Sequence, residues 1–563
     1  MMNARRCLII PAIKKNAAIP DQLVKKLAGK TLIQRALDTA RQVAQGEDIL
    51  VVTDSDEIRL ICRRNGVGCA HDPAIAVRSL NIIASLKPVL EDLAERYEDL
   101  IIYRAVAPLL GAEDIEDAHR RFSGSGSDCL LSVRSLRQRT WREEKVSLQS
   151  LLEDAAEQTV QVEIKALVML RSSLFRERAA GDKVTVMPYF LNDRGLEINS
   201  YQDWWICEKL LRRKRIVFVV AGYPAIGLGH VFRALMLAHE ISDHQISFLC
   251  TRESEQAAAG IAARDYRTRV QDEGDLARNV LALRPHLVIN DFLDTGEDYI
   301  RALREKGCLT VNFEDGGPGA ALADLVINAL YAADTPDRGR FLCGHRYFCL
   351  RDEFLQAERN IFRRRVGRVL ITFGGTDPSG FTQKTLDVLY PECLALGILL
   401  RVVVGPGYAG LPELARHVQE VNREAEELQA LGFLDLPLDS GPFVSFSHAT
   451  NVMSRMMEGV DLAVCAAGRT VFELAHMRVP GIVLAHHARE DAHSFARPRN
   501  GFIYLGFGEE FDEEAVEKAC AQFLDASLRE EFFQRLSRFD FTGNKVRVVR
   551  RILDLLELKA DAP

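Results

Sequence analysis

Short runs of β-branched and other apolar residues alternate along the chain with stretches in which apolar residues recur every three or four positions. The runs are typical of buried strands and the stretches of amphipathic helices, so their alternation predicts α/β layers built on parallel sheets. In the first third, helical periodicity covers 31–44 and 114–122. Buried strands are predicted at 7–11, 48–52, 100–103 and 129–133.

Two basic segments divide this pattern. Residues 212–215 end a helix and are followed at once by a new strand at 216–221, a glycine-rich turn and a helix at 230–241. A fresh strand–turn–helix unit after a charged helix end predicts a domain boundary near residue 214. The connector 363–368 likewise precedes a new strand at 369–373. We therefore predict an N-terminal domain of 1–213, a first lobe of 214–365, and a second lobe of 366–563 that ends in an amphipathic helix at 545–558.

Composition narrows the class of protein. The 563 residues are 47% hydrophobic and 27% charged, which excludes a largely disordered chain because enough apolar surface is available to bury. The net charge of −7 provides no basic excess for a phosphate backbone, so no nucleic-acid partner is expected. The twelve cysteines lack CxxC spacing and are expected to be free thiols in a reducing cytoplasm. The N-terminal apolar run is too short for a signal peptide, and no stretch suits stable membrane insertion.

A glycine-rich turn carries the first candidate chemistry. The segment IVFVVAGYPAIGLGHVFRALMLAHEI joins a strand to a helix through Gly227 and Gly229. Glycines let the backbone approach a ligand, and a helix N-terminus offers unpaired N–H groups and partial positive charge. His230 stands at the first helical turn, where an imidazole faces the carboxyl edge of the sheet. The GxGH context favours a functional histidine over a capping or surface one.

The same segment is similar to a known signature. IGLGHVFRALMLA resembles the GxGHxxRxxxLA motif of the UDP-sugar hydrolase of pseudaminic acid biosynthesis, whose two-lobed GT-B fold is related to the MurG-type glycosyltransferases. Further segments agree in order and spacing: VINDFLDTGEDYIRALREKG, VNFEDGGPGAALADLVINALY, ITFGGTDPSGFTQKTL and DLAVCAAGRTVFELAHMRVPGIVL. The resemblance spans roughly 216–500.

This resemblance implies site residues in both lobes. His230 would orient or deprotonate the attacking water, and Asp291 is the second candidate for that role. No metal or other cofactor is implied for the hydrolysis. The chain departs from the family at Asn290, Asp291 and Phe292, which replace Asp-His-Tyr, and at 490–491, which replace Asn-Gln, so the identity of the sugar stays open. The residues implied for UDP binding are Gly227, Gly229, Gly374, Gly375, Thr376, Gly468, Arg469, Thr470 and Glu473.

The N-terminal region carries a second resemblance. LIIPAIKKNAAIPDQLVKKLAGKTLIQRALDTA, VVTDSDEI, APLLGAEDIEDAH and LEINSYQDWWICEKLL resemble, in order, the motifs of the CMP-sialic acid and related nonulosonate cytidylyltransferases. That resemblance implies a Rossmann-like, GT-A-like nucleotidyltransferase domain that takes CTP and a nonulosonic acid, uses Mg²⁺, and forms a homodimer. The implied CTP-binding residues are Lys14, Lys15, Asp54 and Arg104, and the implied metal ligands are Glu197 and Asn199.

The catalytic motifs of this domain are altered. The glycines of the nucleotide loop are absent around Lys14 and Lys15, and the two metal-binding aspartates of the family fall on Glu197 and Asn199. Because a neutral amide is a weaker Mg²⁺ ligand than a carboxylate, the sequence predicts impaired cytidylyl transfer.

Together the patterns predict an α/β protein with a nucleotidyltransferase-like domain followed by a two-lobed GT-B fold. The leading functional hypothesis is a UDP-sugar hydrolase of nonulosonic acid biosynthesis. Three alternatives stay open: a GT-B glycosyltransferase that uses a UDP-sugar donor, a bifunctional protein with active CMP-sugar synthesis, and a nucleotide-sensing scaffold without turnover.

Overall fold

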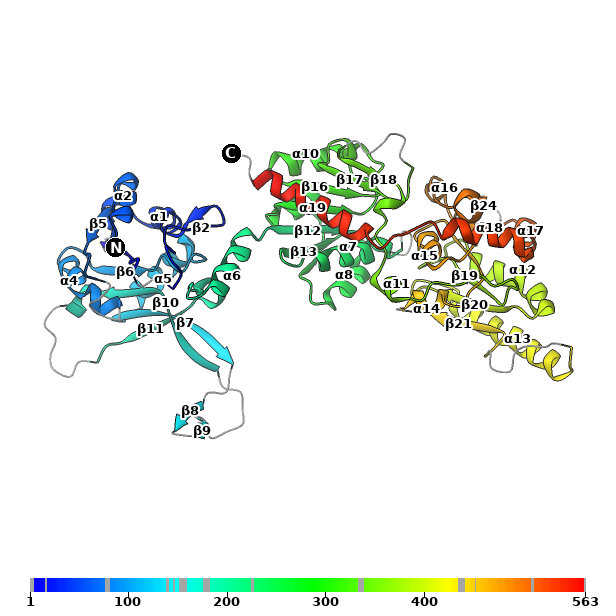
Figure 1. The fold of residues 1–563 in the computed structure, drawn as a ribbon, viewed down its shortest axis with the longest axis horizontal. Helices are drawn as coiled ribbons and strands as arrows, with labels where there is room; N and C mark the ends of the chain where they lie inside the picture. Colours follow the sequence, from blue (N-terminus) through cyan, green and yellow to red (C-terminus); the bar gives the residue numbers. More distant parts are fainter. Residues whose placement is uncertain are drawn as a thin grey trace. The chain divides into compact units, whose positions relative to one another are not determined.

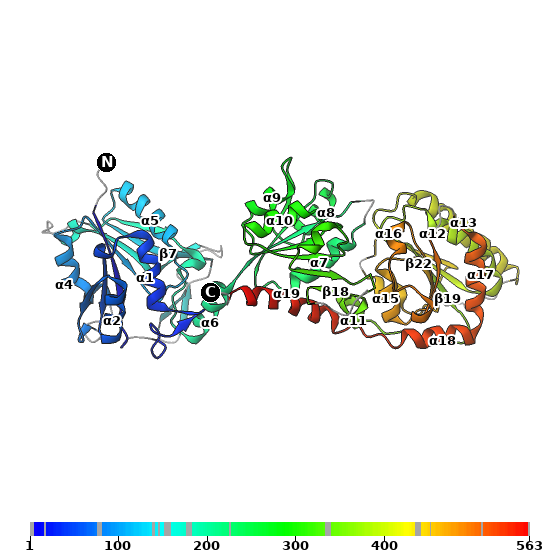
Figure 2. The same ribbon diagram turned by 90° about the horizontal axis from the view of Figure 1, so that it is seen from above.

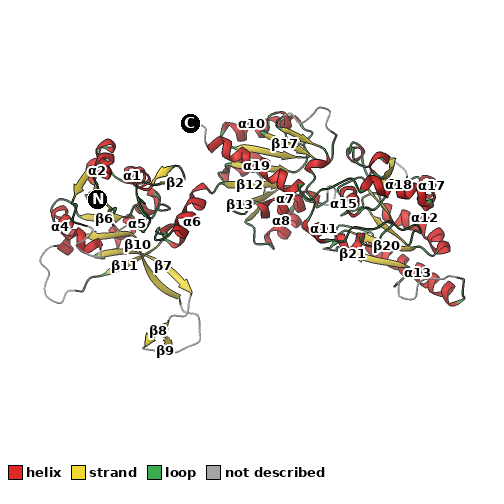
Figure 3. Cartoon of the chain, in the orientation of Figure 1, coloured by secondary structure: helices red, strands yellow, loops and turns green. Residues whose placement is uncertain are grey.

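The computed structural model describes residues 5–15, 18–75, 82–137, 141–144, 147–150, 159–175, 183–223, 227–332, 339–433, 441–450, 452–507 and 511–560. The chain forms two compact units, Met1–Arg213 and Lys214–Pro563. Each unit has its own sheets flanked by helices (Figures 1 and 3). Within the described residues, no helix is both long and apolar enough to cross a lipid bilayer.

Unit 1 is built on one seven-stranded mixed sheet. Four neighbouring strands are parallel, while β10 runs antiparallel to both of its neighbours. Strand β1 (Arg6–Ala12) is almost fully buried because helices pack on both of its faces, which explains its continuous apolar sequence. In spatial order, the strands are β11 (Val186–Phe190), β7 (Cys129–Arg137), β10 (Thr159–Arg171), β6 (Asp99–Tyr103), β1 (Arg6–Ala12), β4 (Ile49–Thr53) and β5 (Gly68–His71).

Two helices of unit 1, α1 and α5, follow the periodicity predicted at 31–44 and 114–122. The side chain of Thr31 caps the first helix by accepting a hydrogen bond from the backbone of Gln34, and the apolar face of that helix is buried against the sheet. The described helices of unit 1 are α1 (Leu32–Val43), α2 (Asp56–Asn65), α4 (Ile82–Ala94), α5 (Ala112–Ser125) and α6 (Tyr201–Arg212).

Unit 2 contains two parallel sheets, which define its two lobes. The first-lobe sheet has the order β14 (Thr268–Val270), β13 (Gln245–Cys250), β12 (Arg215–Val220), β15 (Leu287–Asp291), β16 (Leu309–Phe313), β17 (Leu325–Asn328) and β18 (Phe341–Cys343). The second-lobe sheet has the order β21 (Val444–His448), β20 (Leu399–Val404), β19 (Arg368–Thr372), β22 (Leu462–Ala466), β23 (Gly481–Leu484) and β24 (Phe502–Gly506). The expected α/β class with a two-lobed C-terminal region is confirmed.

Helices cover both sheets of unit 2. The first lobe has α7 (Gly229–Glu240), α8 (Glu255–Ala262), α9 (Leu276–Ala282) and α10 (Glu297–Glu305). The second lobe has α12 (Phe381–Leu396), α13 (Leu411–Ala430), α14 (Met453–Met457), α15 (Thr470–Met477), α16 (Ala488–Asp491), α17 (Glu513–Leu524) and α18 (Ala526–Leu536).

The segment before β19 belongs to the second lobe, which corrects the expected boundary at 365. Helix α11 (Asp352–Gln356) packs against α14 and α15. Asn360 donates to the backbone oxygens of Met457 and Met477, and Arg363 pairs with Asp461 at 2.7 Å. The sequence indicated only a basic connector at 363–368, because the partners of these side chains lie about a hundred positions away.

The last helix, α19 (Asn544–Ala560), was expected in the second lobe but packs on the first, against α7 and β16 (Figures 1 and 2). Its buried residues Val548, Ile552 and Leu556 join the first-lobe core. At its start, Asn544 donates to the backbone oxygens of His345 at 2.9 Å and Phe348 at 3.1 Å. An amphipathic helix must bury its apolar face, and the sequence alone does not say against which lobe.

Replacing Asn544 by alanine should destabilise unit 2 by about 1–3 kcal/mol, because two backbone oxygens lose their donor in a buried place. The measurement is the urea concentration at the midpoint of unfolding of the full chain. The exposed Arg550 of the same helix provides the control, and its alanine variant should shift the midpoint little. Equal shifts in both variants would contradict the anchoring role of Asn544.

Candidate active site

The start of α7 places His230 at the carboxyl edge of the first-lobe sheet. β12 ends at Val220 and α7 begins at Gly229, so the helix N-terminus lies just beyond the strand ends. Gly227 has a φ of +72°, which a residue with a side chain rarely adopts. A Cβ on Gly229 would lie 3.1 Å from Cδ of Arg469, so glycine allows the second lobe to approach closely here.

His230 is held by Asp291, the last residue of β15. Nδ1 of His230 lies 2.6 Å from Oδ1 of Asp291. Because an ionised carboxylate can only accept, Nδ1 carries a proton, and in the neutral ring the free lone pair lies on Nε2. The imidazole is 14% exposed whereas the Asp291 side chain is 1% exposed. The geometry thus presents Nε2 of His230 as a base.

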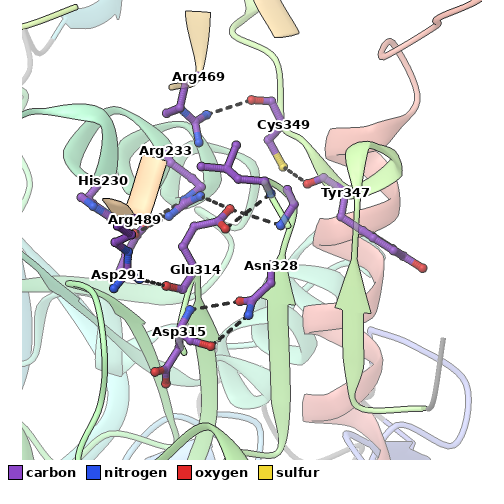
Figure 4. A network of polar contacts seen from close by, with 12 residues as sticks. His230, Arg233, Asp291, Glu314, Asp315, Asn328, Tyr347, Cys349, Arg469 and Arg489 are labelled. Atoms are coloured by element: carbon purple, nitrogen blue, oxygen red, sulfur yellow. Dashed lines mark hydrogen bonds and ion pairs between the residues drawn. The ribbon is translucent and has the colours of Figure 1, made fainter. Parts of the chain in front are cut away.

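Arg233, one helical turn after His230, holds the other side of Asp291 (Figure 4). Its Nε donates to Oδ2 at 2.7 Å, and one terminal nitrogen donates to Oδ1 at 2.6 Å. Its second terminal nitrogen donates to Glu314 at 2.9 Å. Glu314 follows β16 directly and also accepts from the backbone N–H of Ala329. The guanidinium thereby joins one helix to the ends of two strands, β15 and β16, and Glu314 links them to the residue after β17.

Burial and charge together fix the ionisation of this network. Burial alone raises the pKa of Asp291, but attraction to Arg233 and then to His230 outweighs it and sets the pKa to about 2. Burial likewise lowers the pKa of Arg233, but Asp291 and Glu314 raise it well above its usual value. Asp291 is therefore ionised at neutral pH, and both of its oxygens are occupied. This corrects its expected role as a second water-activating base: Asp291 positions His230.

Two arginines of the second lobe complete the network. Arg489 in α16 pairs with Asp294 at 2.9 Å and donates to the backbone oxygen of Glu314. Arg469, at the start of α15, donates to the backbone oxygen of Cys349 at 3.2 Å and lies over the ring of Phe348.

The charge of Arg469 lacks a carboxylate partner within the described residues. Burial, followed by repulsion from Arg233, lowers its pKa to about 10. A partly buried cation without a direct ion-pair partner favours an incoming anion.

The turn after β19 holds Gly374, Gly375 and Thr376. Gly374 has a φ of +84°, and a Cβ on Gly405 would lie 2.4 Å from Cα of Gly375. Asp377 closes the turn by accepting from the backbone N–H groups of Phe381 and Thr382 at the start of α12. The glycines therefore serve close packing of two turns as well as access to the strand edge.

The turn after β22 holds Gly468, Arg469 and Thr470. A Cβ on Gly468 would lie 3.5 Å from Oε1 of Glu490, whose Oε2 accepts from the backbone N–H of His486 at 2.9 Å. Glu473, in the first turn of α15, is paired with Arg351 at 3.1 Å. Arg351 also pairs with Glu353 at 2.6 Å, so one guanidinium is shared by two carboxylates. The sequence did not indicate this partner of Glu473.

In unit 1, the loop after β1 is shaped by Asp54. Its two oxygens accept from the backbone N–H groups of Lys14 at 2.7 Å and Lys15 at 3.1 Å. The ammonium group of Lys14 lies between Asp21 at 2.7 Å and Glu57 at 3.0 Å. The ammonium group of Lys15 donates to the backbone oxygen of Pro73. Asp54 therefore orders the loop, and the charge of Lys14 is compensated by two carboxylates.

Both expected Mg²⁺ ligands are held by other protein groups in this structure. Glu197 is paired with Arg104 at 3.1 Å, and burial raises its pKa. The side-chain amide of Asn199 donates to the backbone oxygen of Glu197, and its backbone N–H donates to the carboxylate of Asp203. Across the described residues, no group of three or more His, Cys, Asp or Glu side chains could hold a metal ion. These residues do not fit Mg²⁺, since the only carboxylate of the pair is tied to an arginine.

Sequence reasoning missed Arg233, Glu314, Arg351 and Arg489 as site residues. Arg233 was detectable, because positions i and i+3 of a helix share a face and His230 was already placed there. The other three have no local signal, since their partners lie in different strands, helices or lobes.

Replacing Asp291 by asparagine should cost about 3–5 kcal/mol of stability at pH 7, because Arg233 stays buried without its main partner. A carboxyl whose folded pKa is lowered stabilises the fold above its unfolded pKa of 3.8 and loses that effect as pH falls toward about 2. The difference between the two proteins in unfolding free energy, measured with urea, should therefore narrow over this range. The control is Asp298→Asn, whose side chain is 99% exposed. A difference that is constant from neutral pH down to acid would contradict the ion pair.

Comparisons with known proteins agree with this organisation. Residues 7–179 match the family model described as Cytidylyltransferase. The N-acylneuraminate cytidylyltransferase of Streptococcus agalactiae is 28% identical over 127 residues, which are 22% of this chain and 30% of that protein. The spore coat polysaccharide biosynthesis protein SpsG of Bacillus subtilis is 24% identical over 318 residues, 53% of this chain and 86% of SpsG.

An uncharacterised protein of Methanocaldococcus jannaschii is 26% identical over 286 residues, 48% of this chain. This chain spans 55% of the length of that archaeal relative. Among solved structures, MurG of Acinetobacter baumannii superposes with a TM-score of 0.42 at 15% identity, covering 61% of this chain and 99% of MurG. The chain thus joins a cytidylyltransferase-like unit to a second, two-lobed α/β unit.

Proposed function

We propose that unit 2 hydrolyses a UDP-linked sugar. Water attacks the anomeric carbon, the bond from that carbon to the diphosphate oxygen breaks, and UDP and the free sugar leave with inversion at the anomeric centre. The observation that carries the proposal is the pairing of His230 with the buried, ionised Asp291, which leaves Nε2 as the acceptor for a proton of the attacking water.

Positively charged groups lie where the departing diphosphate would gain negative charge. The N-termini of α7 and α15 come together where Gly229 meets Arg469. Helix N-termini carry partial positive charge, and Arg469 adds a partly buried cation that forms no direct ion pair with a carboxylate within the described part of unit 2. This arrangement would stabilise negative charge as it develops on the leaving group, and it requires no metal ion.

The nucleotide and the sugar would occupy the second-lobe turns. Gly374, Gly375, Thr376, Gly468 and Thr470 line the strand ends where a uridine diphosphate would lie. Glu473 would accept from ribose hydroxyls only by sharing its carboxylate with Arg351, so we assign Glu473 and Arg351 jointly to ribose binding. For the sugar we propose a diacetamido-trideoxyhexose, with Oε1 of Glu490 as an acceptor for its hydroxyl or amide groups.

The relatives support a place in the metabolism of sialic-acid-like sugars. One is named for neuraminate activation with cytidine nucleotide, and another for polysaccharide biosynthesis. We therefore propose that the chain acts in nonulosonic acid biosynthesis. Transfer of the sugar to a hydroxyl acceptor is the second candidate, because the same base could deprotonate an alcohol in place of water.

For unit 1 we propose a cytidylyltransferase fold with impaired turnover. The charge of Lys14 is compensated by Asp21 and Glu57, and the carboxylate of Glu197 is held by Arg104. A triphosphate would meet less free positive charge and a poorer metal site than the reaction needs. The homodimer through this unit stays a prediction of the sequence.

Replacing His230 by asparagine should lower UDP release about 10²–10⁴-fold, as expected for loss of a general base. The assay uses the full chain with a panel of UDP-linked diacetamido-trideoxyhexoses, with and without a hydroxyl acceptor. UDP affinity, measured by calorimetry, should change little. His239→Asn, on the exposed side of the same helix, is the matched control. Release that occurs only with acceptor would replace hydrolysis by transfer, and an unaffected rate in the His230 variant would refute the base assignment.

Unit 1 should release pyrophosphate from CTP, Mg²⁺ and nonulosonic acids orders of magnitude more slowly than an intact enzyme, because one metal carboxylate is missing. Asn199→Asp restores a carboxylate at that position and should increase the rate, whereas Asn199→Gln should not. Robust turnover in the unmodified chain that disappears in Glu197→Gln would contradict this proposal and make the chain bifunctional.

A further inference from the structure

A cavity of about 630 Å³ opens at the amino-terminal edge of the first-lobe sheet. Strands β12, β15 and β16 begin there and run in parallel toward the edge that carries His230 and Asp291. The cavity is therefore separate from the active site. Its lining consists of Lys214, Arg215, Leu281, Arg284, Pro285, His286, Lys306, Gly307, Cys308, Leu309 and Leu556.

All the charged side chains in this lining are positive. Lys214, Arg215, Arg284 and Lys306 bring four cations together with His286, and no carboxylate is among the described residues that line the cavity. None of the four cations forms an ion pair in the described part of the chain. Because like charges repel, this concentration is unusual in a protein with a net charge of −7. An anion in the cavity would relieve that repulsion.

The donors are also arranged to face a ligand. The backbone N–H of Arg215 donates to Nδ1 of His286 at 2.9 Å, so the neutral ring carries its proton on Nε2 and can donate from there. Nε of Arg215 donates to the backbone oxygen of Arg284, which leaves its two terminal nitrogens for other acceptors. Arg284, which follows the C-cap of α9, has a φ of +50°.

Apolar side chains cover the rest of the wall. Leu281, Pro285, Leu309 and Leu556 offer a surface for an uncharged organic group. The volume lies within the range of small-molecule sites, and it exceeds what an inorganic ion needs. We propose that this cavity binds an organic phosphate of nucleotide size, with its phosphate on the cluster of Arg215, Arg284 and Lys306 and its organic part against the leucines.

The proposal is tested by calorimetry on the full chain with CMP and with pyrophosphate as probes. The double variant Arg284→Glu, Lys306→Glu should weaken one binding event roughly 10- to 100-fold, the effect of removing charge-assisted hydrogen bonds. The surface variant Arg416→Glu, Lys518→Glu changes the net charge equally and should bind like the unmodified chain. Arg469→Met should also keep this event, because Arg469 belongs to the active site.

A second measurement needs no variant. CMP should slow the acetylation of Lys214 and Lys306 by the N-hydroxysuccinimide ester of acetic acid, as measured by mass spectrometry. Acetylation of Lys518 should be unaffected. Protection by pyrophosphate as well would show that phosphate recognition dominates, and protection by CMP alone would show that the organic part is required; either result supports the site. Equal affinity of the double variant and the unmodified chain, or no protection of Lys214 and Lys306 by either probe, would overturn it.

Discussion

The buried guanidinium of Arg233 is the interaction on which the geometry of unit 2 depends. It binds Asp291 with two nitrogens and Glu314 with the third, and so ties helix α7 to the ends of neighbouring strands. In a low-dielectric interior, the loss of one partner leaves a buried charge uncompensated. The three charged side chains are therefore expected to keep or lose their stabilising effect together. Because Arg233 keeps Asp291 ionised, it also decides which nitrogen of His230 is free to accept a proton.

The site is assembled from both lobes. Arg469 and Arg489 come from the second lobe and reach Cys349, Asp294 and the backbone of Glu314. Gly229 allows this approach because a larger residue would meet Arg469. α19 completes the construction by crossing back from the second lobe to pack on the first. The reactive geometry is therefore a property of the whole unit and not of either lobe.

Charge compensation distinguishes the two nucleotide-related regions. In unit 1, Lys14 and Glu197 are already paired with Asp21, Glu57 and Arg104. In unit 2, Arg469 is partly buried and forms no direct ion pair with a carboxylate among the described residues. A cation that the protein itself leaves uncompensated favours an anionic ligand, whereas one that is paired must first lose its partner. This difference is the physical basis for assigning the main chemistry to unit 2.

The sequence by itself determined the strand–helix order, the α/β class, the glycine turns and the place of His230. These features depend on local periodicity and on motifs of about a dozen residues, so they can be read without the fold. Only the tertiary structure decided the partners: Arg233 with Asp291, 58 positions away, and Arg351 with Glu473, 122 positions away. It also assigned α19 to the first lobe. Such contacts depend on strand order and lobe packing, which bring together residues that are far apart in the sequence. No local sequence pattern predicts them.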